Sequence, residues 1–203
     1  ETAYGPSPLL NAWIVKTDSM GNQQWYNAFG GTDSDIAYCV AQTADGGYIL
    51  AGETRSFGYN MLLVKTDSLG NQEWMKTFGG AGGDYCNSVQ QTFSGGYILA
   101  GYTLSYGAGG DDVWVVKTDS MGNEVWNETY GGTSSDVGYS VKQTTDGGYI
   151  VVGHTLSYGA GLHDVWLVKL ESDETPPLPL EVDAGGPYEG LVGEPIQFIG
   201  TVE

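Results

Sequence analysis

The fold of this chain is decided by the stretch Val113–Gly132, VWVVKTDSMGNEVWNETYGG, because close copies of it recur along the chain. AWIVKTDSMGNQQWYNAFGG begins at Ala12, LLVKTDSLGNQEWMKTFGG begins at Leu62, and the partial copy VWLVKLES begins at Val165. Each full copy has two runs of β-branched and aromatic residues around an Asp-Ser-x-Gly-Asn turn, a pattern that predicts a β-hairpin. Self-similarity at a fixed period indicates a repeat architecture.

A second module alternates with the first. It reads DIAYCVAQTADGGYILAGET from Asp35, DYCNSVQQTFSGGYILAGYT from Asp84 and DVGYSVKQTTDGGYIVVGHT from Asp136. Two strand-like runs flank a Gly-Gly turn in each copy, which predicts another hairpin. The lysines of the first module follow one another at spacings of 49, 52 and 52 residues.

Four strands in about 50 residues is the period of a β-propeller blade. Runs such as YILAG and WVVK are apolar at successive positions, as expected of a sheet packed between two other sheets. No stretch has a 3.6-residue apolar period, so we expect almost no helix. We predict an all-β fold in which each second module and the first module after it form one four-stranded blade, giving about three and a quarter blades in residues 1–170.

The repeat pattern ends after Lys169. Residues 171–180, ESDETPPLPL, are typical of an acidic, Pro-rich linker, and residues 181–203 open a second strand-rich domain. At the other end Glu1 aligns with Glu53, so the repeat is interrupted there too. We expect either a fragment of a longer propeller or a piece that another chain completes.

Two resemblances follow from these motifs. DAGGPYEGLVGEPIQFIGT resembles the opening of a PKD domain, an immunoglobulin-like sandwich of archaeal and bacterial surface proteins. The VKTDSxGNxxW and DGGYIxxG repeats resemble propeller repeats that precede PKD domains in large secreted or cell-wall-linked proteins. The resemblance implies an exported protein, extracellular or at the cell surface, with structural or adhesive duties.

The charge excludes several partners. The chain carries 25 acidic residues against 7 basic ones, a net charge of −18. Such a chain is repelled by nucleic-acid phosphates and by anionic lipid headgroups. No apolar run approaches the ~18 residues of a membrane span, so we expect no membrane insertion.

Three sets of residues recur in register and are expected to be structural. The DSMGNEVW turn resembles the Asp box of sialidases and the tryptophan-docking turn of quinoprotein propellers, which implies that the Asp ties the turn and the Trp packs between blades. A half-buried Lys needs a partner, and the Asp that opens each second module recurs in register with it. We predict one internal ion pair per blade from these two sets. The turn set is Asp18, Asp67, Asp119, Trp25, Trp74 and Trp126; the lysines are Lys16, Lys65, Lys117 and Lys169; their expected partners are Asp35, Asp84 and Asp136.

Acidic, Gly-rich loops raise the question of calcium, which binds six to eight oxygen ligands. We expect solvated turns, with calcium at Asp33, Asp35, Asp111 and Asp112 as the alternative and no other cofactor. Asn127 begins an Asn-Glu-Thr acceptor pattern for glycosylation.

Cys39 and Cys86 lie on equivalent strands, displaced by two positions. Residues two apart share a strand face, so we expect both thiols on the same face of successive blades, free rather than bonded, with a disulfide as the alternative.

Nothing identifies catalytic residues. His154 and His163 lie in or beside connectors without a nucleophile motif, and no acid pair has priority for glycoside hydrolysis. Tyr106 and Tyr158, in the repeated TLSYGAG connector, either offer a platform for sugars or pack their own loop.

We therefore expect a non-enzymatic extracellular scaffold or adhesion module. Exposed blade edges invite pairing with another chain, so its expected partners are other protein chains, including copies of itself in a head-to-tail filament, and extracellular glycans. The alternatives are a polysaccharide-acting hydrolase or lyase and a glycan-binding lectin.

Overall fold

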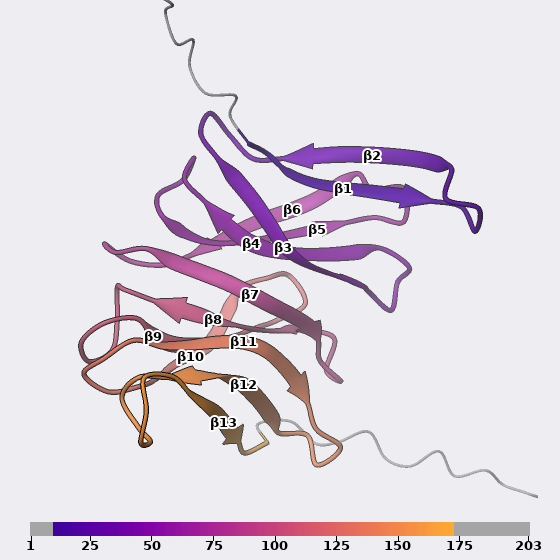
Figure 1. Ribbon diagram of the computed structural model, residues 1–203. Helices are drawn as coiled ribbons and strands as arrows, with labels where there is room; N and C mark the ends of the chain where they lie inside the picture. Colours follow the sequence, from indigo (N-terminus) through magenta and orange to yellow (C-terminus); the bar gives the residue numbers. More distant parts are fainter. Residues whose placement is uncertain (1–9, 173–203) are drawn as a thin grey trace, which may run out of the picture.

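A computed structural model describes residues 10–172, which contain thirteen β-strands and no helix (Figure 1). The strands form four separate antiparallel sheets. The all-β prediction is therefore confirmed for this part of the chain. The expected PKD segment at 181–203 and most of the expected linker lie outside the described residues.

The sheets follow one another in chain order. The first contains β1 (Ala12–Thr17) and β2 (Gln23–Phe29). The second contains β3 (Asp35–Gln42), β4 (Tyr48–Thr54), β5 (Asn60–Thr66) and β6 (Gln72–Phe78). The third contains β7 (Asp84–Gln91), β8 (Tyr97–Thr103), β9 (Asp112–Thr118) and β10 (Glu124–Tyr130). The fourth contains β11 (Asp136–Gln143), β12 (Tyr149–Thr155) and β13 (Asp164–Leu170). Each complete sheet thus joins a second module to the first module after it, as predicted.

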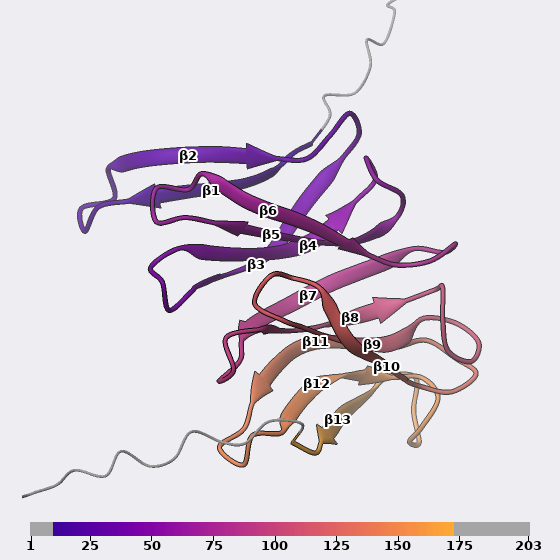
Figure 2. The same cartoon turned by 180° about the vertical axis from the view of Figure 1, so that it is seen from behind.

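The sheets stack face to face, so the middle two are covered on both sides (Figures 1 and 2). In β5, Met61 and Leu63 belong to the apolar cluster shared with the third sheet. Their neighbours Leu62 and Val64 belong to the cluster shared with the first sheet. All four side chains are buried, which explains why this strand is apolar at successive positions instead of alternating.

Successive sheets pack more closely at one edge than at the other. The first strands of successive sheets pack on one another, β3 on β7 and β7 on β11. No packing of that extent joins the last strands β2, β6 and β10 of the described sheets. The sheets therefore diverge from an inner edge, formed by β3, β7 and β11, toward an outer edge.

Each inner strand contains a β-bulge at the same position. The pairing of β3 with β4 passes from Ala37 to Cys39 and leaves Tyr38 unpaired. In β7 the unpaired residue is Asn87, and in β11 it is Tyr139. A bulge re-aims side chains and reverses the faces that follow it.

This bulge overturns the expected orientation of the cysteines. Cys86 precedes the bulge of β7 while Cys39 follows that of β3, so the two thiols lie on opposite strand faces and share one apolar cluster between the second and third sheets. Both are free. Burial raises the pKa of the Cys86 thiol to about 12, which leaves it un-ionised and unreactive.

The outer turns are built alike in all three full hairpins. Asp119 Oδ1 accepts hydrogen bonds from Met121 N at 2.9 Å and Asn123 N at 2.8 Å, and Gly122 has φ of 74°. Asp18 and Asp67 make the equivalent bonds. A Trp of each hairpin then meets a Tyr of the next sheet edge-on, at centroid distances of 5.7, 5.8 and 6.0 Å for Trp25–Tyr48, Trp74–Tyr97 and Trp126–Tyr149.

The predicted pairing of the lysines with Asp35, Asp84 and Asp136 is wrong. Lys65 Nζ lies 2.8 Å from Asp45 and 2.8 Å from Glu73, and Lys169 Nζ lies 3.0 Å from Asp146. Asp45 and Asp146 belong to the Asp-Gly-Gly turns, which the hairpin brings to the lysine end of the neighbouring strand.

The three buried aspartates instead anchor the connectors. Asp84 accepts hydrogen bonds from the Thr103 hydroxyl, from Ser105 Oγ at 2.7 Å and from Gly80 N at 2.9 Å. Asp35 and Asp136 have the equivalent serine and glycine donors. Several donors compensate a carboxylate for its lost hydration, so no basic partner is needed.

Candidate functional site

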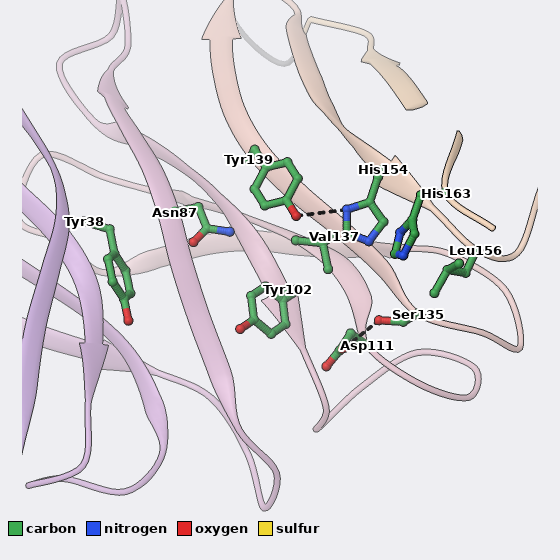
Figure 3. A pocket seen from close by; sticks show the side chains of 10 residues that line it. All are labelled: Tyr38, Asn87, Tyr102, Asp111, Ser135, Val137, Tyr139, His154, Leu156 and His163. Carbon is green, nitrogen blue, oxygen red and sulfur yellow. Dashed lines mark hydrogen bonds between the residues drawn. The ribbon is translucent and has the colours of Figure 1, made fainter. Parts of the chain in front are cut away.

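A pocket of about 400 Å³ opens at the inner edge of the stack (Figure 3). We call it the inner-edge groove. It draws on the second, third and fourth sheets and on the connectors that precede β9, β11 and β13. Its lining residues are Tyr38, Asn87, Tyr102, Asp111, Ser135, Val137, Tyr139, His154, Leu156 and His163.

The bulges deliver three of these side chains. Tyr38, Asn87 and Tyr139 are the residues that the strand pairing of β3, β7 and β11 leaves unpaired. The bulge requires a glycine opposite it, because a Cβ on Gly101 would come within 1.8 Å of the Tyr85 carbonyl oxygen. The recurring glycine of the second module therefore makes room for the bulge, and the bulge directs these residues into the groove.

A tyrosine and two histidines meet at one end of the groove. Tyr139 Oη and His154 Nδ1 are hydrogen-bonded at 3.0 Å. The rings of His154 and His163 lie edge to face with centroids 4.6 Å apart (Figure 3). The contact joins β11, β12 and the connector before β13, so it exists only when the fourth sheet is assembled.

Polar groups continue along the groove floor. Ser135 Oγ donates to Asp111 Oδ2 at 2.5 Å (Figure 3). Asn87 Nδ2 donates to the Gly138 carbonyl at 2.8 Å and ties β7 to β11, while its amide oxygen remains an acceptor. The groove therefore presents a carboxylate, an amide, a hydroxyl and two imidazoles within one cavity.

Two tyrosines of the groove, Tyr102 and Tyr38, have a raised pKa. Burial, together with the nearby Tyr85 and Asp111, raises the pKa of Tyr102 to about 12. Tyr102 stacks on Tyr85 at a centroid distance of 4.6 Å and an interplanar angle of 17°. Burial and the Glu53 carboxylate also raise the pKa of Tyr38. At neutral pH these phenols are hydrogen-bond donors with apolar ring faces.

The groove gathers positions at which the otherwise similar modules differ. The bulge position is Tyr, Asn and Tyr in successive modules, and the sixth position of the following strand is Glu53, Tyr102 and His154. The residue before the third strand is Tyr59, Asp111 and His163. By contrast the Gly-Gly-Tyr-Ile of the inner turn is the same in all three modules.

The residues proposed for calcium lie in two places. Asp33 is exposed beside the buried Asp35, whereas Asp111 and the buried Asp112 precede and begin β9. Asp35 already accepts from protein donors, and Asp112 Oδ2 accepts from Ala108 N at 2.8 Å. Within residues 10–172 no group of three or more His, Cys, Asp or Glu side chains is arranged to hold a metal ion. Calcium at these residues stays a prediction.

Other predicted residues lie away from the groove. Asn127 is exposed on β10, where its amide oxygen accepts from Trp114 Nε1 at 3.0 Å; its glycosylation stays a prediction. Tyr106 and Tyr158 tie their connectors to the preceding ones, since their hydroxyls donate to the Gly79 and Gly131 carbonyls at 3.1 and 2.8 Å. Their rings lie against Trp114 and Trp166.

The sequence analysis missed the groove as a unit. It named Asp111, His154 and His163 singly and gave the histidines no role. The signal that could have found them is the comparison of modules with each other, because several columns that differ between modules converge on one edge once the repeats stack.

No protein-family model and no curated protein matches this chain. Within the described residues, no helix is long and apolar enough to cross a membrane.

Proposed function

We propose that this chain is a propeller-type segment of a secreted or cell-surface protein, and that it is a non-enzymatic adhesion scaffold whose inner-edge groove binds an extracellular glycan. The blade assignment is supported by sheets that share an inner edge and diverge outward. Binding, localisation and the absence of catalysis are parts of the same proposal. They are supported by the chemistry of the groove and by the resemblance of the repeats to those of exported proteins.

The single observation that carries the proposal is where the modules differ. Both faces of the middle sheets are used for stacking, and the outer turns repeat one design. At the inner-edge groove the sixth position of the following strand is Glu53, Tyr102 or His154, so each module contributes a different side chain there. Repetition supplies rigidity, whereas departure from it at one edge supplies a surface for recognition.

The groove chemistry favours a sugar. Neutral tyrosine rings offer apolar faces for the C–H surface of a pyranose, with a hydroxyl at the rim of each ring. Asp111, Asn87 and His154 offer acceptors and donors for sugar hydroxyls. A cavity in which aromatic rings lie beside a few convergent polar groups is a common arrangement in small-ligand sites.

A glycan array tests this function. Wild-type protein should bind a defined subset of extracellular glycans, and Tyr139→Phe and His154→Ala should each weaken that binding about tenfold, as expected when a site loses one group that hydrogen-bonds the ligand. Tyr158→Phe is the matched control, because its hydroxyl bonds a carbonyl outside the groove. Equal binding by all four proteins, or no binding at all, contradicts the proposal.

The second candidate is a polysaccharide lyase or hydrolase, and the Tyr139–His154 hydrogen bond favours it. A tyrosine and a histidine 3.0 Å apart form a pair that can move a proton. Incubation with the glycans that bind on the array distinguishes the two functions. Unsaturated or shortened products that disappear in His154→Ala identify an enzyme, and unchanged glycans identify a binding module.

The expected head-to-tail assembly also remains a proposal. Val165 and Leu167 of β13 are 84% and 61% exposed. The equivalent residues of β5, Met61 and Leu63, are fully buried between the second and third sheets. Wild-type protein should form oligomers in light scattering, and the double variant Val165→Glu/Leu167→Glu should be monomeric. A concentration-independent monomer of the wild type contradicts head-to-tail assembly.

A further inference from the structure

A strand edge and an apolar groove lie open together at the first sheet. Within residues 10–172, β1 pairs with β2 and with no other strand. A pocket of about 280 Å³ runs beside it, lined by residues 14–17 of β1, by residues 40–42 of β3, and by Trp25 and Tyr48. Figure 1 shows these strands at one end of the stack, with β1 beside β3. An unpaired edge presents a row of free backbone donors and acceptors.

The other sheets show what fits this edge. The strands equivalent to β1 are β5, β9 and β13, and each pairs with the Tyr-Ile strand of its own second module, β4, β8 or β12. The register is the same in all three. In the second sheet Tyr48 lies opposite Thr66, Ile49 opposite Lys65 and Leu50 opposite Val64.

The exposure of one valine column marks the same place. Val40 of β3 is 54% exposed, while Val89 of β7 is 3% exposed and Val141 of β11 is fully buried. Val89 shares its cluster with Ile49 and Ala51 of β4, and Val141 shares its cluster with Ile98 and Ala100 of β8. In the third and fourth sheets, the Tyr-Ile strand of the preceding sheet therefore buries this valine.

The lysine column gives independent evidence. Lys65 is buried and pairs with Asp45 of the Asp-Gly-Gly turn just before its Tyr-Ile strand. Lys16, its equivalent on β1, is only half-buried and lies over the Tyr48 ring at 5.8 Å. A strand added to β1 in the common register would bring an acidic residue to Lys16.

We propose that the β1 edge is an acceptor site for an extended peptide strand of the pattern Asp-Gly-Gly-Tyr-Ile-x-x-Gly, added antiparallel to β1. The Tyr of the strand lies opposite Thr17, the Ile opposite Lys16 and the Gly opposite Trp13. The Ile side chain covers Val40, and the Asp pairs with Lys16. Backbone hydrogen bonds supply affinity, and the alternating pockets supply specificity.

A peptide with the sequence of residues 44–54, ADGGYILAGET, is the probe. Labelled and capped, it should bind the intact 203-residue chain saturably and about tenfold more tightly than a scrambled peptide of the same composition, because only the former offers matched side chains along the edge. Replacing its Asp by Asn should weaken binding only about two- to threefold, since an exposed ion pair contributes little. Amides of β1 should gain protection from hydrogen exchange when the peptide is bound.

Two protein variants distinguish binding at the β1 edge from non-specific binding. Val40→Glu should weaken peptide binding about tenfold by placing a charge under the added Ile. Val152→Glu is the matched control, because Val152 is a partly exposed valine on β12 at the other end of the stack; it should leave binding unchanged.

Each remaining outcome overturns the proposal. Equal binding of the scrambled peptide, or protection at β13 instead of β1, shows that the edge does not select this strand. If the wild-type protein forms a dimer that protects the β1 amides and that the peptide does not displace, the edge binds a second copy of the chain. Groove variants such as His154→Ala should leave peptide binding intact, so this test and the glycan test fail independently.

Discussion

The outer turns and the inner edge of the stack are built from the same modules but obey opposite rules. At the outer turns Asp18, Asp67 and Asp119 make the same hydrogen bonds in the same geometry. At the inner edge the bulge position carries tyrosine or asparagine, and each makes different contacts. The outer turns therefore serve the same structural role in every module, whereas the inner edge gives each module its own side-chain contacts.

Removing a repeated anchor should have the largest effect. Asp84→Ala should cost about 3 kcal/mol of unfolding free energy, because it leaves buried hydroxyl and amide donors of the connector unpaired. Chemical denaturation measures the loss. Ser105→Ala, which removes one donor and keeps the carboxylate, should cost about 1 kcal/mol. If both variants are as stable as wild type, the anchors are not structural.

Filling the bulge should have the next largest effect. Gly101→Ala places a Cβ 1.8 Å from the Tyr85 carbonyl oxygen, so the strand pair must shift at a cost of about 2 kcal/mol or more. Gly161→Ala is the control, because its Cβ would meet only ordinary contacts in an exposed connector. Equal melting temperatures for the two variants would show that the bulge tolerates a side chain.

Acid should loosen the turns. Hydrogen bonds from Asn22, Asn71 and Asn123 lower the pKa of the three turn aspartates, and hydrogen bonds from Thr144 and Lys169 lower the pKa of Asp146 to about 2. Because the folded state lowers these pKa values, the carboxylates stabilise the fold at pH values above about 4, the ordinary pKa of aspartate. That stabilisation is lost as the pH falls below it. The melting temperature should therefore drop between pH 5 and pH 2, and less steeply in Asp67→Asn. A flat profile over that range would contradict this role of the turns.

Relieving a buried charge should have a smaller effect of the opposite sign. Burial raises the pKa of Asp112, and the Asp136 and Asp111 carboxylates raise it further. A raised pKa makes the folded state lose stability as pH rises, so Asp112→Asn should stabilise by about 1 kcal/mol at neutral pH and by less in acid. Asn60 already occupies the equivalent position in the second sheet. Denaturation at two pH values measures the gain, and a loss of stability at both would contradict the prediction.

Changes in the groove should have the smallest effect on stability. Tyr139→Phe and His154→Ala should alter unfolding free energy by no more than about 0.5 kcal/mol, since both residues lie at a solvent-facing edge. If either variant costs as much as Asp84→Ala, the groove residues are structural anchors like Asp84. The comparison on which the proposed function rests would then fail.

Most of the fold could be predicted from the sequence, and most of the site could not. Strand runs, turns and the joining of two modules into one sheet follow from local patterns such as YILAG and DGG, and the structure has them. The partner of Lys65 and the faces of Cys39 and Cys86 were predicted wrongly. Both errors arise from where a hairpin turn or a one-residue bulge places a side chain in space.

The sequence by itself determined an all-β stack of repeated antiparallel sheets, because backbone pairing and two-sided apolar strands are encoded locally and recur in every module. Only the tertiary structure decided that Tyr139, His154 and His163 share a groove and that the β1 edge lies open beside Val40. Both features are made by residues from different modules, and their distances are set by how sheets diverge from a common edge. That divergence is a property of the packed stack, and no single repeat contains it.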